Sequence, residues 1–84
     1  MLLLLLVLGC GESQDGWSDG CADGTATGGE WGAEDAASCA ASDPTPPAAD
    51  LGHGDYATAY TDGYDECFRD AYRDAYADGW TGCR

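Results

Sequence analysis

Basic residues are almost missing from this chain of 84 residues. It contains no lysine, and three arginines stand against sixteen Asp and Glu residues, for a formal net charge of −13. Such an acidic surface repels nucleic acid and anionic lipid headgroups, so we expect neither as a partner. The acidic side chains themselves are expected to form a solvated face.

The side chains that most often carry catalysis or bind metals are equally scarce. The single histidine, His53, lies in a Gly-His-Gly loop with no second histidine or cysteine at ligand spacing. There is no Cys-x-x-Cys motif, and no serine has a base in a recognisable arrangement. We therefore expect no enzymatic activity, no catalytic or metal-binding residue, no cofactor and no small-molecule substrate.

The chain also lacks an apolar run long enough to span a bilayer, which takes ~20 residues. Its longest apolar run covers only residues 1–8. It is typical of an export signal. Val7-Leu8-Gly9-Cys10 resembles the lipobox of bacterial lipoproteins. This resemblance implies a signal peptide over residues 1–9 and acyl chains such as palmitate on Cys10. Because Gly11 follows the cysteine, the family rule implies anchoring in the outer membrane. We expect residues 10–15 to form a lipidated tether.

Five cysteines are many for so short a chain. An odd number in an exported protein suggests that one thiol has a separate role, and lipidation gives that role to Cys10. The other four, Cys21, Cys39, Cys67 and Cys83, then form two disulfides in an oxidising compartment. A chain of this size buries little apolar surface, so it needs such cross-links.

The rest of the chain contains a four-residue repeat in two stretches. Its small residues are Gly16, Gly20, Gly24, Gly28, Gly32, Ala36 and Ala40, and then Ala59, Gly63, Cys67, Ala71, Ala75 and Gly79. In the second stretch each small residue is followed by an aromatic one: Tyr60, Tyr64, Phe68, Tyr72, Tyr76 and Trp80. Residues four apart share one face of an α-helix, so the spacing predicts helices.

We therefore predict an all-α fold, a disulfide-stapled antiparallel two-helix hairpin over residues 16–84. Its helices would span about 16–43 and 55–82 and be joined by a Pro-rich turn over 44–54. A column of Gly and Ala leaves a flat surface that another helix can approach closely, so packing through small residues is expected. Tandem G-x-x-x repeats also resemble those of a eukaryotic family of cytosolic adaptor proteins, in spacing alone.

Helix geometry limits how the cysteines can pair. Within a straight helix Cys21 and Cys39 would be about 27 Å apart, and Cys67 and Cys83 about 24 Å, so both disulfides must join the two helices. In an antiparallel pair, facing positions have a constant sum. The sums are 106 for Cys39–Cys67 and 104 for Cys21–Cys83, which favours this nested pairing.

Two alternatives remain for the first stretch. The segment from Asp15 to Gly24 is rich in Asp and Gly, like calcium-binding loops, although its carboxylates recur every fourth residue and not at the alternate positions of such loops. Residues 11–32 could instead be a flexible tether, although such linkers are poor in aromatics.

The sequence thus predicts a lipid-anchored structural module that presents an acidic, aromatic-rich helical surface to a protein partner in the bacterial envelope. It would be attached to the membrane through Cys10. The alternative function is that of an Asp-rich calcium-binding lipoprotein.

Overall fold

The computed structural model describes residues 11–47 and 52–83. Helix α2 (Gly11–Ala37) and helix α3 (Asp55–Trp80) pack against each other, and a short 3-10 helix, η1 (Thr81–Cys83), follows α3. No β-strand occurs within these described ranges. The predicted all-α class, the packed pair of helices and the two disulfides are confirmed.

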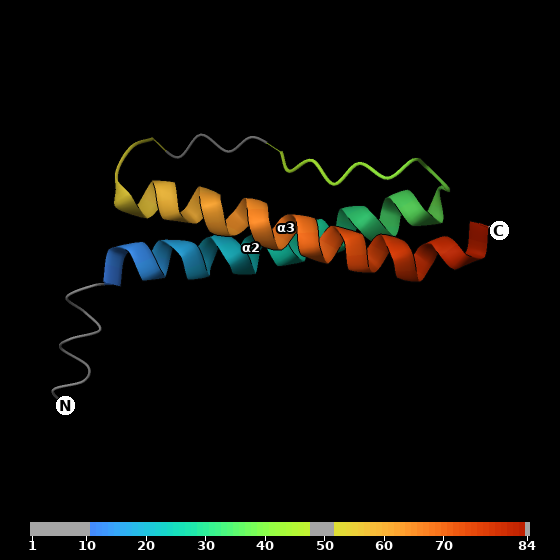
Figure 1. The fold of residues 1–84 in the computed structure, drawn as a ribbon, viewed down its shortest axis with the longest axis horizontal. Coiled ribbons are helices and arrows are strands. Elements are labelled where there is room, and N and C mark those ends of the chain that lie inside the picture. Colours follow the sequence, from blue (N-terminus) through green and yellow to red (C-terminus); the bar gives the residue numbers. More distant parts are fainter. Residues whose placement is uncertain (1–10, 48–51, 84) are drawn as a thin grey trace, which may run out of the picture.

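The two helices run parallel, so the predicted antiparallel direction is wrong. In Figure 1 both helices start at the left and end at the right, and they cross near the middle. The contacts agree with this direction: Gly16 lies against Tyr56 near the start of both helices, and Gly32 lies against Tyr72 near their ends.

The disulfides are Cys21–Cys67 and Cys39–Cys83, with Cα–Cα distances of 5.0 and 5.6 Å. The prediction that both bridges connect the two stretches is confirmed, with Cys39 just after α2 and Cys83 in η1, but the nested pairing Cys39–Cys67 and Cys21–Cys83 is wrong. In a parallel pair, facing residues keep a constant difference in position. The observed separations of 46 and 44 residues satisfy that condition.

Helix α2 begins and ends earlier than predicted. Residues 11–15, expected to be part of a tether, form its first turn, and the alternative of a flexible tether over 11–32 is likewise wrong. The helix ends at Ala37 and not at residue 43, because a Schellman motif closes it: the Ala40 N–H donates to the Asp35 carbonyl (2.8 Å) and the Cys39 N–H to that of Ala36 (3.0 Å). Cys39 occupies the left-handed position of this motif, with φ 53°.

The predicted Pro-rich turn is instead part of a return segment, residues 38–54, of which 38–47 and 52–54 are described. It connects the end of α2 to the start of α3 at the opposite end of the pair (Figure 1). A 26-residue helix is about 39 Å long, whereas 17 residues in a polyproline-like conformation reach about 53 Å. The connection is therefore long enough for a parallel arrangement.

The core consists of α3 rings that lie close to the backbone of α2. Phe68 and Tyr72 are fully buried, as is Ala36 of α2. Helix α3 itself begins after Gly54, whose φ of 113° is readily adopted only by glycine. Its last residues pass into η1, where Cys83 reaches Cys39.

Candidate functional site

The glycines of α2 let the backbones of the two helices touch. At five successive repeat positions, a Cβ atom would lie 2.0–2.5 Å from a carbonyl oxygen of α3: Gly16, Gly20, Gly24, Gly28 and Gly32. The facing α3 residue is always forty positions later, from Tyr56 to Tyr72. The predicted packing through small residues is therefore confirmed, and no residue larger than glycine fits these five positions without a shift of the helices.

The contact is reciprocal on α3. A Cβ atom at Gly63 would lie 2.3 Å from the carbonyl oxygen of Trp17, and one at Gly79 would lie 2.8 Å from the Cβ of Ala36. One repeat after Gly63, Cys67 forms its disulfide with Cys21. Both helices thus contribute small residues to the same interface, and the first disulfide lies in line with them.

Helix α3 carries an unbroken row of stacked aromatic rings, here called the aromatic ladder. Its members are Tyr56, Tyr60, Tyr64, Phe68, Tyr72, Tyr76 and Trp80. Neighbouring ring centroids are 5.2–6.2 Å apart, and their planes are inclined by 11–30°. The five pairs from Tyr60 to Trp80 are stacked, as aromatic pairs favour, and the Tyr56–Tyr60 pair is tilted. The ladder follows from aromatic residues at every fourth position, because residues four apart are neighbours on successive turns of a helix.

Carboxylates of α2 accept hydrogen bonds from three ladder hydroxyls. Tyr56 donates to Asp19 over 2.7 Å, Tyr60 donates to Asp23, and Tyr72 donates to Asp35. Each acid stands thirty-seven positions before its tyrosine, so the three pairs repeat one geometry. The acids that the sequence suggested as a solvated column therefore also bind across the interface.

The return segment holds the far end of the ladder. The Asp43 N–H donates to the Tyr72 hydroxyl over 2.9 Å, and the Tyr76 hydroxyl donates to the Ala40 carbonyl over 2.7 Å. Because Tyr72 also donates to Asp35, its hydroxyl joins α2, α3 and the return segment at one point.

One repeat departs from the Tyr–Asp pattern on both helices at once. Phe68, the only ladder ring besides Trp80 without a phenol hydroxyl, faces Trp31, which stands where Asp occurs in the repeats of Asp19, Asp23 and Asp35. The two rings meet edge to face, with centroids 5.4 Å apart. An apolar pair thus replaces a hydrogen-bonded pair, which avoids burying a hydroxyl without an acceptor.

The carboxylates affect the ionisation of the phenols. The hydrogen bond to Asp23, followed by partial burial and the Asp23 charge, raises the pKa of Tyr60 to about 12. The pKa of Tyr56 is raised mainly by its hydrogen bond to Asp19. That of Tyr72 is raised first by burial and then by the hydrogen bond to Asp35, while the Asp43 N–H lowers it. The neutral phenol is therefore the form that fits this interface.

Alkaline pH is expected to destabilise the protein through these groups. For Tyr60 the raised pKa gives a contribution that is fully present below pH 10 and is lost as the pH rises towards about 12. Absorbance titration of tyrosinate should show one group with a pKa near 12, and Asp23→Asn should lower that pKa towards 10. Asp15→Asn serves as the control, since Asp15 is exposed and is not paired with a ring hydroxyl. Titration of all tyrosines together near 10 would contradict the Tyr60–Asp23 pair.

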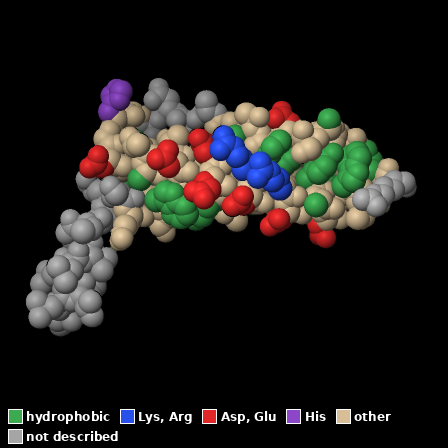
Figure 2. Space-filling model, in the orientation of Figure 1, with side chains coloured by type: hydrophobic (Ala, Val, Ile, Leu, Met, Phe, Trp, Pro, Cys, Tyr) green, Lys and Arg blue, Asp and Glu red, His purple; other side chains and the backbone are tan. Residues whose placement is uncertain are grey.

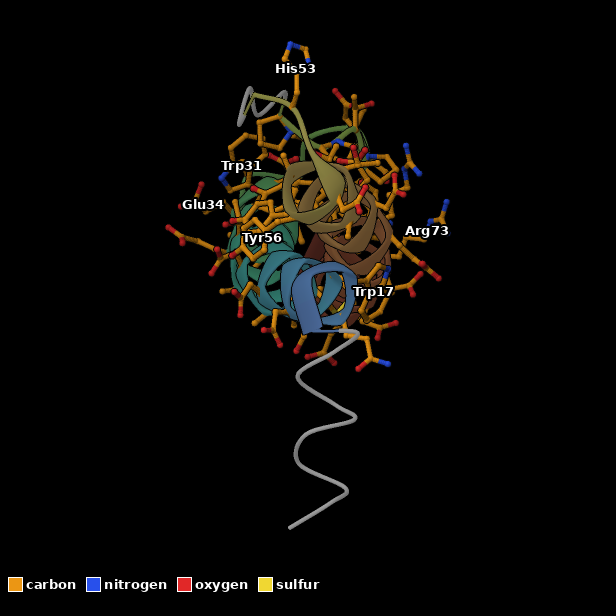
Figure 3. The ribbon with its side chains drawn as sticks, turned by 90° about the vertical axis from the view of Figure 1, so that its left-hand side faces the viewer. Trp17, Trp31, Glu34, His53, Tyr56 and Arg73 are labelled. Atoms are coloured by element: carbon orange, nitrogen blue, oxygen red, sulfur yellow. A yellow bond between two sulfur atoms is a disulfide. The ribbon has the colours of Figure 1, made fainter. Side chains whose placement is uncertain are left out.

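Large aromatic side chains remain accessible to solvent on two sides of the pair. Trp31 and Trp17 are each 40% exposed and Tyr56 is 41% exposed. Viewed along the pair in Figure 3, Trp31, Glu34 and Tyr56 lie on one side, and Trp17 and Arg73 lie on the other. In Figure 2 the arginines gather in the middle of the face that is seen, among acidic side chains.

We call the first of these sides the aromatic–acidic face, and its residues are Asp19, Asp23, Trp31, Glu34 and Tyr56. Its rings are supported from beneath, because Trp31 packs on buried Phe68 and Tyr56 packs against Tyr60. Its acids include the two that bind Tyr56 and Tyr60. The sequence pattern identified these residue types, but not that Trp31 and Tyr56 would share a side.

The other predicted sites are placed as follows. Cys10, the predicted lipidation site, and the signal peptide over residues 1–9 lie outside the described residues. His53 is exposed and, in Figure 3, extends away from both helices. Across residues 11–47 and 52–83, no three His, Cys, Asp or Glu side chains gather as a metal site would require. No helix in those ranges is long and apolar enough to cross a membrane.

The acids of the calcium alternative, Asp15, Asp19 and Asp23, lie on successive turns of α2. Two of them accept hydrogen bonds from tyrosines of α3. They therefore line one side of a helix, whereas a calcium loop surrounds the ion with oxygen ligands.

Comparisons of the chain with protein-family models, with curated proteins and with solved structures found no match.

Proposed function

We propose that this protein is a lipid-anchored interaction module of the bacterial envelope, held in the outer membrane through Cys10, that presents its aromatic–acidic face to a protein partner. The observation that carries the proposal is the exposure of Trp31 and Tyr56 beside carboxylates on a helix pair fixed by two disulfides. Aromatic rings are enriched where proteins bind one another, and rigid ones lose little entropy on binding.

The charge of this face indicates the chemistry of the partner. Asp19, Asp23 and Glu34 lie near the exposed rings, while Arg73 lies on the opposite side of the pair (Figure 3). A partner surface that carries Arg or Lys would pair with the carboxylates and could place a cation over the indole of Trp31. Two disulfides also fit an oxidising compartment such as the periplasm or the cell surface.

The parallel direction of the helices bears on the anchor. Cys10 directly precedes Gly11, the first residue of α2, and α3 begins at the same end of the pair. A lipid on Cys10 would therefore hold the pair by the end where Tyr56 lies, and Trp31 would lie about six helical turns away from the anchor.

Photo-crosslinking in the native envelope tests this proposal. With benzoylphenylalanine at position 31 we expect one discrete adduct, whereas the same group at position 33, also exposed, should give none. Intact mass should show acyl chains on a chain that begins at Cys10, and Cys10→Ala should move the protein to the soluble fraction and abolish the adduct. Equal adducts from both positions would contradict the docking face, and a chain without lipid would contradict the anchor.

A further inference from the structure

The aromatic ladder has a property that packing alone does not require: its rings form a continuous series from one end of α3 to the other. No step between neighbouring centroids exceeds 6.2 Å from Tyr56 to Trp80, a length of about 36 Å. Indole and phenol are also the side chains that are most readily oxidised by one electron. Rings in contact allow an electron vacancy to pass from each ring to the next.

Removal of an electron from a phenol requires that its proton leave as well, because the phenol radical cation is a strong acid. Three ladder hydroxyls already donate hydrogen bonds to carboxylates, at Tyr56–Asp19, Tyr60–Asp23 and Tyr72–Asp35. Each pair can pass the proton from Oη to the carboxylate as the electron departs. Each of these three tyrosines can therefore hold the oxidation as a neutral phenoxyl radical.

The weak point of such a series is Phe68, because its ring is much harder to oxidise than phenol or indole. At that position Trp31 lies against Phe68 with its centroid 5.4 Å away. An oxidisable ring from α2 therefore lies beside the one ladder member that is not readily oxidised. The Phe–Trp exception in the repeat then has a consequence beyond packing.

We propose that the aromatic ladder carries one-electron oxidation along α3 from Trp80 towards Tyr56, with Trp31 as a relay beside Phe68. A one-electron oxidant, such as an oxygen- or nitrogen-centred radical, takes an electron from the Trp80 indole and is itself reduced. Electrons then pass from ring to ring towards Trp80, and the electron vacancy ends on a tyrosine. The product at Tyr56 is a neutral phenoxyl radical with its proton on Asp19, and Trp80 is restored.

Pulse radiolysis of the full-length protein with both disulfides intact tests the proposal. Azide radicals oxidise indoles selectively, and Trp17→Phe removes the indole that lies on the opposite side of the pair. We expect the indolyl absorbance to decay as the phenoxyl absorbance grows, in a first-order process whose rate does not depend on protein concentration. Transfer that occurs only between molecules, or no transfer, would overturn the proposal.

Two variants separate the ladder from simple proximity of Trp and Tyr. Tyr76→Leu should remove the phase that begins at Trp80 and preserve the phase that begins at Trp31. The double change Asp19→Asn and Asp23→Asn keeps the side-chain shape but removes the proton acceptors, so it should slow phenoxyl formation at that end by about a hundredfold. Asp15→Asn is the matched control and should leave the rate unchanged.

Circular dichroism and retention of both disulfides must show that each variant is folded. If Tyr76→Leu is not folded, Trp31→Phe, at an exposed position, takes its place and should slow transfer from Trp80. Unchanged kinetics in a folded Tyr76→Leu or Trp31→Phe protein would overturn the route through the ladder. Unchanged kinetics in the double Asp variant would overturn the role of the carboxylates. None of these results depends on the anchor or on a partner.

Discussion

Gly28→Ala is expected to lower the free energy of unfolding by about 3 kcal/mol, whereas Gly29→Ala, one residue away, should raise it by about 0.5–1 kcal/mol. A Cβ atom at position 28 would lie 2.3 Å from the Phe68 carbonyl oxygen and 2.9 Å from its Cα, so the helices must separate. At position 29 there is nothing within 4 Å, and alanine gains its intrinsic preference for the helix.

Urea unfolding with both disulfides intact measures the two effects, and far-UV circular dichroism reports the helix content. The pair of variants is matched in chemistry, in helix and in sequence neighbourhood, and differs only in the face on which the methyl group is placed. Equal stabilisation by both substitutions would show that Gly28 does not lie against the backbone of α3.

Loss of either disulfide is expected to cost about 4 kcal/mol. The bridges close segments of 46 and 44 residues, and a loop of that length restricts the unfolded chain by this amount. We expect Cys21→Ala with Cys67→Ala, and separately Cys39→Ala with Cys83→Ala, each to lower the midpoint of urea unfolding by similar amounts. The free energy of unfolding of small proteins is about 5–15 kcal/mol in total, so reduction of both bridges should unfold this protein.

The pairing itself can be read from peptides. Cleavage after Glu12, Glu30, Glu34 and Glu66, together with tryptic cleavage after Arg69 and Arg73, places the four disulfide cysteines in four different peptides. Without reduction, peptide 13–30 should be joined to 67–69, and peptide 35–66 to 74–84. Peptide 13–30 joined to 74–84 would restore the nested pairing and with it the antiparallel direction.

The helices and their close contact could be predicted from the sequence, but their direction could not be predicted from the cysteines. The position sums of the nested pairs, 106 and 104, differ by two, and so do the separations of the observed pairs, 46 and 44. The cysteines therefore fit both directions equally well. The prolines of the connecting segment favour a turn, although the length of the segment also allows a return along the whole pair.

A signal for the direction was nevertheless present in the exceptions to the repeat. Phe68 lacks the hydroxyl of its neighbours, and Trp31, like Thr27, stands in the column of α2 that otherwise carries Asp. In a parallel register thirty-seven positions apart these two meet, and Tyr60 and Tyr72 meet Asp23 and Asp35. The end of α2 could not be predicted from the sequence, because a Schellman motif with cysteine in the left-handed position has no glycine to mark it.

The regularity of the repeat creates an ambiguity that the chain must resolve. If α3 slid along α2 by one repeat, about 6 Å, glycines would again meet backbone carbonyls over most of the interface. Tyr60 would then face Asp19, so several hydrogen bonds would also form anew. What such a stagger would lose is the match between Phe68 and Trp31 and the two cysteine pairs. The bridges therefore do more than stabilise the pair, because they select one alignment from a series of nearly equivalent ones.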